Sequence, residues 1–289
     1  MMVRNPTVAG SFYPGSASAI REQVHTWLQD ITIPPLGDAL GGIVPHAGWI
    51  YSGRTALHLF KAMSAGTPTD TVILFGAVHT RGLYGPSLYG RGAWRTPLGD
   101  ALVDEELALQ IVAMDGRYAD RPSDHAGEHS IEVLVPFVQC LLPEARILPV
   151  AMPPIEEALC LGGVAAEAAR RAGKRVAVVG STDLTHYGPR YGLAPAGIGL
   201  QGLAWTHAND RRMLDLVVSM RGEGVLPEAL ARHNACGPGA VAASMAMASD
   251  LGASRGELLH YTTSYEVMPD GRPSDFVGYG AVAFVGDPA

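Results

Sequence analysis

The sequence predicts an α/β fold with a mixed, largely parallel central sheet and helices on both faces. Short apolar runs typical of buried strands alternate along the chain with longer segments whose apolar residues recur at helical spacing. The 289 residues are 47% hydrophobic and 17% charged, with 35 Gly and 21 Pro, which suits a compact protein with many tight turns. Because no repeat, low-complexity block or obvious linker interrupts the pattern, we expect one domain over residues 1–289.

The first half of the chain is expected to begin with two capped helices separated by a strand. Ser16 is placed to cap a helix over 19–30, a strand follows at 41–44, and Ser52 is placed to cap a helix over 54–63. The elements expected after these are a strand at 71–76, a hairpin or loop beside the site at 81–100, a helix at 104–114, a loop at 117–130 and a helix at 131–142.

The second half continues the alternation of strands and helices. Strands are expected at 146–152, 175–180, 256–265 and 276–285, and helices at 155–173, 210–220 and 238–251. The segment 192–202 is rich in glycine and small side chains that can bury little surface, so it is the expected mobile lid.

Composition and missing motifs exclude several functions. The net charge is −7 and no run of Lys or Arg occurs, so we expect neither nucleic acid nor an anionic membrane as a partner. The motifs GxGxxG after the first strand, GxxxxGK[ST] and GxSxG are absent, which removes the phosphate-binding loops and the nucleophile elbow that dinucleotide, nucleotide-triphosphate and serine-hydrolase sites need.

The cysteines and the N-terminus indicate a cytoplasmic protein. Cys140, Cys160 and Cys236 are widely spaced and odd in number, which argues against a disulfide scaffold and favours a reducing compartment. No apolar segment typical of a secretory signal follows Arg4, and the longest uncharged stretches are broken by Gly and Pro. We therefore expect no membrane span.

Three strand-like runs each end in small residues followed by a histidine, namely His46, His79 and His186. The carboxyl ends of the strands face the ligand crevice in an open α/β sheet, so these side chains can converge although they are far apart in sequence. A single such histidine is more often a hydrogen-bonded structural residue. Their repeated placement favours a built site.

Cys236 opens a helix-like run, where the helix N-terminus would lower the thiol pKa by stabilising the thiolate. This position suits a metal ligand or a nucleophile, whereas the alternative is a buried, inert cysteine. Cys140 and Cys160 lie within apolar helical patterns and are expected to be inert. Imidazole and thiolate together are the ligand set of a borderline or soft divalent metal.

Asp183 and His186 stand three residues apart at the end of a buried strand. His186 can act as a general acid or base, or as a further ligand, because imidazole titrates near neutral pH. Asp183 can orient it, or it can be only a cap of the following turn. Elsewhere in the chain, the segment GEHSIE with Glu128 and His129 is not an HExxH zinc-protease motif, so that motif is absent.

A substrate pocket is expected near these residues. Its walls are expected to include Phe12, Trp49, Tyr51, Glu128 and His129. Aromatic side chains at loop and element ends can line a pocket, although loop anchoring is nearly as common. For Glu128, a solvated carboxylate at a helix start is the alternative.

Six stretches occur in a characteristic order: VAGSFYPGS, VPHAGWIYSG, GAVHT, EHSIEVLVPFVQ, STDLTHYG and ACGPGAV. Together they resemble the Memo family, including proteins labelled AmmeMemoRadiSam system protein B, over nearly the whole chain. The resemblance implies an α/β fold related to class III extradiol ring-cleaving dioxygenases of the LigB type. It places the family's metal ligands on His46, His79 and Cys236, and its neighbouring site residues on Asp183 and His186.

The resemblance also implies a cofactor and a reaction class. We expect one Fe(II) or Cu ion, with Zn as an alternative, and metal-dependent oxidation or oxygenation in which His186 transfers a proton. Extradiol dioxygenases hold Fe(II) with two histidines and a carboxylate, so a thiolate from Cys236 would make the site softer and catechol cleavage less secure.

Two other functions stay open. The first is a binding module whose crevice recognises a peptide or a partner, since the resemblance implies association with radical-SAM and AMMECR-type proteins. The second is a zinc hydrolase with a metal-activated water.

Overall fold

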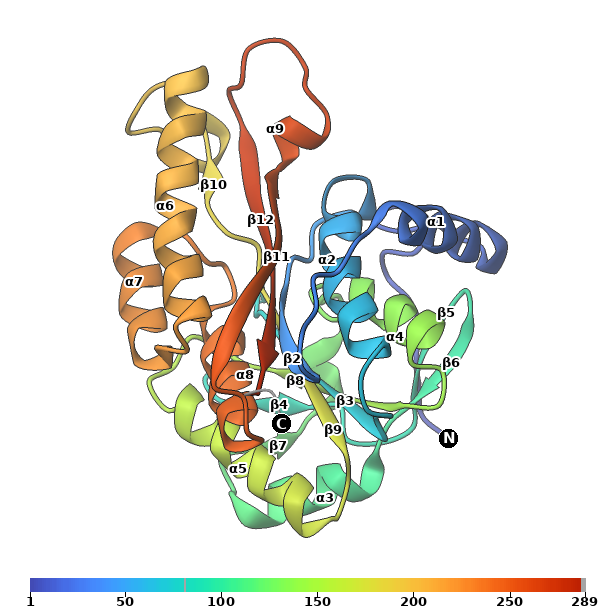
Figure 1. The fold of residues 1–289 in the computed structure, drawn as a ribbon. Helices are drawn as coiled ribbons and strands as arrows, with labels where there is room; N and C mark the ends of the chain where they lie inside the picture. The colour runs from blue at the N-terminus through green and yellow to red at the C-terminus, as the bar shows by residue number, and fades with distance from the viewer. Residues whose placement is uncertain (81, 287–289) are drawn as a thin grey trace.

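The computed structural model describes residues 1–80 and 82–286 (Figure 1). Four parallel strands form the middle of the main sheet, in the order β2 (Ala39–Val44), β9 (Val176–Ser181), β3 (Thr71–Gly76) and β8 (Arg146–Ala151). Each is an almost continuously buried apolar run, as expected of parallel strands covered on both faces.

Antiparallel strands extend the sheet on both sides, so the sheet is mixed. On one side β12 (Phe276–Val285) pairs with β2, and β11 (Arg255–Thr263) and β10 (His186–Tyr187) pair with β12. On the other side β4 (Ser87–Leu88) pairs with β8, and β7 (Ala119–Asp120) pairs with β4. The predicted fold class is confirmed.

A smaller sheet lies at one side of the molecule. It joins β1 (Val3–Arg4), β5 (Ala93–Thr96) and β6 (Gly99–Leu102). The strands β5 and β6 form a hairpin within and just beyond the segment 81–100, as expected, while Arg81 lies outside the described residues. Strand β5 also pairs with β1, in the N-terminal segment.

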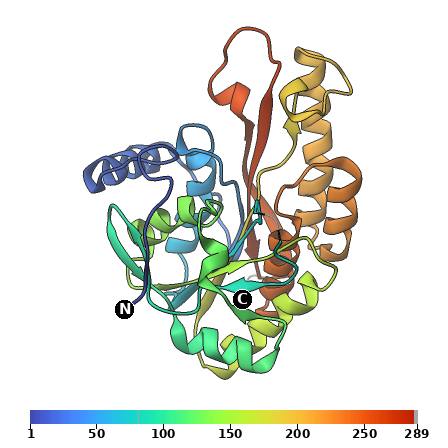
Figure 2. The ribbon, with the colours of Figure 1, turned by 180° about the vertical axis from the view of Figure 1, so that it is seen from behind.

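Helices cover both faces of the main sheet (Figures 1 and 2). A Cβ added at Gly42 of β2 would meet Leu59 of α2 (Trp49–Ser64), whereas one added at Gly180 would meet Ser244 of α8 (Pro238–Asp250). Gly42 pairs with Val179 and not with Gly180, so the two glycines face opposite sides. Hence α2 and α8 lie on opposite faces.

Further helices pack on these two. The helices α1 (Ala17–Asp30) and α4 (Val135–Leu141) lie against α2, and α5 (Ala158–Arg171) lies against α8. The remaining helices are α3 (Glu105–Met114), α6 (Leu200–Val218), α7 (Val225–Arg232), the short α9 (Ser264–Val267), and 3-10 turns at Pro122–His125, Glu132–Leu134, Pro189–Tyr191 and Gly222–Gly224.

Two expected helix starts are wrong. Helix α2 begins at Trp49 with Gly48 as its N-cap, so Ser52 lies inside the helix and donates to the carbonyl of Ala47. Helix α6 begins ten residues before the expected position 210, so the end of the expected lid segment is helical. The rest of that segment is tied down, since Ala196 donates to the hydroxyl of Tyr187 and this hydroxyl donates to Gly197.

None of the helices among residues 1–80 and 82–286 combines the length and the apolar character that crossing a membrane requires.

Candidate metal centre

His46 follows β2 and is held in one orientation by its neighbours. Its Nδ1 lies 2.8 Å from the hydroxyl of Ser181, and this hydroxyl donates its only proton to the carbonyl of Ser130, 2.7 Å away. The hydroxyl must therefore accept a hydrogen bond from Nδ1–H. As a result the Nε2 atom of His46 carries a free lone pair, which is the form that binds a metal.

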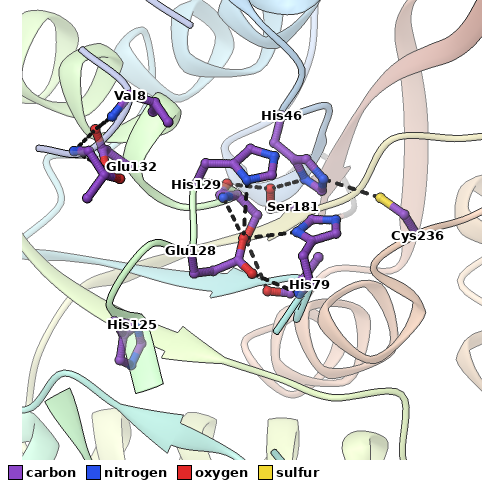
Figure 3. A network of polar contacts seen from close by, with 12 residues as sticks. Val8, His46, His79, His125, Glu128, His129, Glu132, Ser181 and Cys236 are labelled. Atoms are coloured by element: carbon purple, nitrogen blue, oxygen red, sulfur yellow. Dashed lines mark hydrogen bonds and ion pairs between the residues drawn. The ribbon is translucent and has the colours of Figure 1, made fainter. Parts of the chain in front are cut away.

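His79 follows β3 and is oriented in the same way by a carboxylate. Glu128 accepts hydrogen bonds from the backbone N–H of His79 at 2.8 Å and from its Nδ1 at 3.0 Å (Figure 3). Burial alone would raise the pKa of Glu128, but the hydrogen bonds from His79 and from the N–H of Ser130 hold it well below its usual range. Glu128 is thus a carboxylate, and its hydrogen bond raises the pKa of His79. Because Nδ1 is held by Glu128, a metal can bind His79 only at Nε2, in place of a proton.

Cys236 lies directly before α8, whose N-cap is Gly237. Its Sγ is 3.3 Å from Nε2 of His46 and accepts a hydrogen bond from the backbone N–H of Asp183 at 3.2 Å. A Cβ at Gly237 would collide with the carbonyl oxygen of Ser181, so glycine lets the start of α8 approach β9 closely. This approach brings Cys236 to the ends of the strands.

The ligand atoms of His46, His79 and Cys236 all lie within 4.8 Å of one another. The two imidazole rings meet edge to face with their centroids 5.1 Å apart (Figure 3). Two free imidazole nitrogens and one sulfur therefore point into a common space, as the sequence predicts for the ends of these strands.

Burial sets the protonation of two of these residues when no metal is bound. Desolvation lowers the pKa of His46 to about 4, against an opposing effect of Asp183, so its imidazole is neutral near pH 7. Desolvation also raises the pKa of the Cys236 thiol. The expectation that the helix N-terminus lowers the pKa of this thiol is thus wrong for the metal-free protein. Desolvation of Cys236 raises the pKa by more than the hydrogen bonds from Asp183 and Thr182 lower it. A metal binds the thiolate and displaces this proton.

A second group of possible ligands, His79, Glu128 and His129, has atoms equally close together. Its carboxylate is already occupied, since Oε1 accepts from Nδ1 of His79 and from the N–H of Ser130, and Oε2 accepts from the N–H of His79. The His129 ring stacks on His79, with 4.9 Å between centroids. We therefore interpret this group as a support for His79.

Asp183 and His186 lie beside the three converging residues. Asp183 accepts a hydrogen bond from the backbone N–H of His46 at 2.8 Å, and its other oxygen is 3.9 Å from Nε2 of His186. That Nε2 atom is buried and has no hydrogen-bond partner among the described residues. Desolvation lowers the pKa of His186, with Asp183 opposing the shift, so His186 is neutral and able to accept a proton.

A polar cavity of about 600 Å³ opens next to these residues, and Asp183, His186, His129, Phe12 and Tyr51 all line it. The sequence predicts seven residues for proton transfer and for the substrate pocket, and these five of them line the cavity.

Trp49 and Glu128 do not line this cavity. Trp49 is buried, stacks on Phe137 at 4.2 Å and donates to the carbonyl of Val133. Glu128 is also buried, and its oxygens are used by His79 and Ser130. The expectation that both contact a substrate does not fit this geometry, because neither side chain reaches the cavity.

Two residues that were not predicted from the sequence, Arg4 and Asn209, hold segments around the site. The guanidinium of Arg4 donates to the carbonyls of His125 and Glu128 and forms an ion pair with Glu132, so the N-terminal strand fixes the segment that carries Glu128. Asn209 of α6 donates to the hydroxyl of Thr185 and to the carbonyl of Arg232. No local motif marks either residue, since their partners are distant in sequence.

A family model described as Memo-like protein matches residues 4–283. A MEMO1 family protein of Thermococcus onnurineus is 37% identical over 299 residues, which cover 98% of this chain and 99% of the relative. MEMO1 family proteins of Methanothermobacter thermautotrophicus, at 37% over 290 residues, and of Nitrosopumilus maritimus, at 34% over 305 residues, cover 96% and 98% of this chain and 99% and 100% of their own length.

Proposed function

This chain belongs to the Memo-like protein family, and on that premise we propose that it binds one Fe or Cu ion for an oxidation or oxygenation reaction. The mixed sheet with helices on both faces is consistent with the LigB-like fold. The observation that carries the proposal is the convergence of Nε2 of His46, Nε2 of His79 and Sγ of Cys236, with Nδ1 of each histidine held by another residue so that Nε2 faces the other donors.

The donor set suits such an ion. Imidazole binds Fe, Cu and Zn, and a thiolate favours softer ions such as Cu(I) over Mg or Ca. Three protein ligands leave coordination positions for a substrate, and a bound Fe or Cu would supply one-electron redox chemistry. The side chain of His79 is 36% exposed, so a metal ion or a substrate can reach the space between the three proposed ligands from solvent.

His186 is the proposed proton-transfer residue. It is neutral in the metal-free protein and lines the polar cavity, where it can accept a proton from a bound substrate. The carboxylate of Asp183, 3.9 Å from its Nε2, would stabilise the resulting imidazolium. Asp183 also fixes the backbone of His46, so one side chain links proton transfer to the ligand geometry.

Elemental analysis of anaerobically purified protein tests the metal site. We expect about one metal per chain in the wild type and none in His46→Ala, His79→Ala or Cys236→Ala. The matched controls, Cys140→Ala and Cys160→Ala, change thiols outside the site and should retain the metal. Full occupancy in the three site variants would overturn the assignment.

Metal identity and oxygen uptake separate the remaining candidates. Fe or Cu together with oxygen consumption supports the oxidoreductase, whereas Zn without oxygen consumption supports the hydrolase with a metal-activated water. The third candidate is a binding module for radical-SAM or AMMECR-type partners, for which retained partner binding by a metal-free, inactive His46→Ala variant would be the expected result. A cytoplasmic location, which suits three free cysteines, is part of the proposal.

A further inference from the structure

A second cavity, of about 580 Å³, shares His186 with the polar cavity and reaches Cys236. Its walls come from the segment after β10, from α7 and from the start of α8 (Figure 1). Most of its lining is apolar and includes Leu184, Tyr191, Leu193, Ala229, Leu230 and Pro238. No Asp, Glu, Lys or Arg side chain occurs among the described residues that line it. Its size is that of a small-molecule site.

The two cavities differ in chemistry although they share His186 and Tyr191. The polar cavity is lined by charged side chains, among them Arg190, Arg272 and Asp275. Apart from His186 and His233, the described residues in the walls of the apolar cavity offer no side chain that could form an ion pair, so burying a charged group there is costly. The apolar cavity therefore selects against charge.

The mouth of the apolar cavity exposes large apolar side chains. Leu230 is 65% exposed and Tyr191 is 43% exposed, so both leave apolar surface in water where a ligand could cover it. The rings of Tyr191 and His186 lie 5.1 Å apart and form part of the wall. Rings in the wall of a cavity favour a planar ligand that can stack on them.

We propose that this cavity binds an uncharged, planar and largely apolar small molecule, or such a part of the substrate, beside Cys236 and His186. The proposal rests on the proposed metal function, since it places the ligand next to a proposed metal ligand and the proposed proton-transfer residue. Binding in the cavity depends only on the lining residues, so it is testable with metal-free protein and can fail independently of the metal site.

Indole is a suitable probe because it is neutral, planar and mostly apolar. We expect it to shift the leucine methyl NMR signals of Leu193 and Leu230 in the full-length, chelator-treated protein, while the signal of Leu109 stays in place. Leu230→Asp and Leu193→Asp should weaken indole binding about tenfold or more, the effect of losing a good apolar contact. Leu109→Asp is the matched control, because Leu109 is a 72% exposed helical leucine in α3, away from the cavity.

Unchanged indole affinity in Leu230→Asp, and in Leu193→Asp if that variant folds, would overturn the proposal. Leu230 is exposed, so its replacement leaves the core intact and keeps the test valid even if Leu193→Asp fails to fold. Tighter binding of the anion indole-3-acetate than of indole would also overturn it, because the walls would then favour charge. Anaerobically purified wild-type protein that contains no metal but binds indole would instead count against the proposed metal function alone.

Discussion

The hydroxyl of Ser181 accepts a hydrogen bond from Nδ1 of His46 at 2.8 Å while donating its own proton to the carbonyl of Ser130. Ser181 therefore fixes the tautomer of His46, a proposed metal ligand, by accepting a hydrogen bond at Nδ1 and leaving Nε2 for the metal. The donor direction at Ser181 is unambiguous, because a carbonyl oxygen can only accept.

Ser181→Ala should weaken metal binding by about 10–100-fold, the usual cost of losing a residue that orients a metal-ligating histidine. Without the hydroxyl, the His46 ring can bind a proton at either nitrogen and is free to turn. A metal competition titration measures the effect. Ser244→Ala is the control, since Ser244 is a buried serine that donates to the carbonyl of Val241 on α8. Equal affinities in wild type and Ser181→Ala would contradict the proposed orienting role.

Two buried glutamates four residues apart are expected to affect different properties. Glu128→Gln should lower metal affinity, because an amide holds Nδ1–H of His79 less strongly than a carboxylate does. Glu132→Gln should instead lower the free energy of unfolding by about 3 kcal/mol, because it leaves the buried Arg4 guanidinium without its ion partner. Metal titration and urea unfolding of both variants check this separation. A Glu132→Gln protein that loses metal but keeps its stability would refute it.

His186→Ala should retain the metal and lose turnover by a factor of about a hundred or more, as expected for a general acid or base lost from an otherwise intact site. The measurements are elemental analysis and oxygen uptake by the reduced, metal-loaded protein with catechol-like substrates. If the variant loses its metal as completely as His46→Ala does, then His186 is a ligand. If it keeps full turnover, the proton-transfer role is wrong.

Asp210 should make stability depend on pH. Burial raises the pKa of this carboxyl group to about 7, against hydrogen bonds from the N–H of Thr185 and the hydroxyl of Tyr261. The native state then holds a proton that the unfolded state loses above about pH 4, so the contribution of Asp210 to stability is complete below pH 4. It declines as pH rises from about 4 to about 7.

Asp210→Asn removes this titration and keeps a side chain of similar shape. The difference in free energy of unfolding between Asp210→Asn and wild type should therefore increase from pH 4 to pH 7 in favour of the variant, by roughly a few kcal/mol. Urea unfolding across this range measures the difference. Parallel stability curves for the two proteins would show that Asp210 does not titrate in this window.

Elements with a strong local pattern were predicted well from the sequence. Strand β12 has the expected bounds, and α3, expected over 104–114, spans Glu105–Met114 with Asp104 as its N-cap. The start of α2 was missed because the N–H of Trp49 bonds the carbonyl of Phe12, a distant partner. Helix α7 was not predicted, and it carries Pro227 in its first turn, where proline is tolerated because the N–H groups have no intrahelical acceptor.

The candidate site, too, could be predicted only in part from the sequence. The residues at the strand ends follow from the rule that carboxyl ends meet at one edge, so His46, His79 and Asp183 could be predicted to converge. Their supports could not, because Ser181 reaches His46 only through the pairing of β2 with β9, and Arg4 reaches Glu128 across 124 positions of the chain. Trp49 was misassigned because a buried and a cavity-facing aromatic look alike in sequence.

His46 and Cys236 are 190 positions apart in the sequence, so the proposed metal centre can be completed only after most of the chain has been synthesised. During synthesis the chain emerges from its N-terminus, so both histidines leave the ribosome long before the cysteine does. A growing chain can thus hold an ion only loosely, through two imidazoles. The third donor arrives when the last quarter of the protein docks, so tight metal uptake would report that translation and folding are complete.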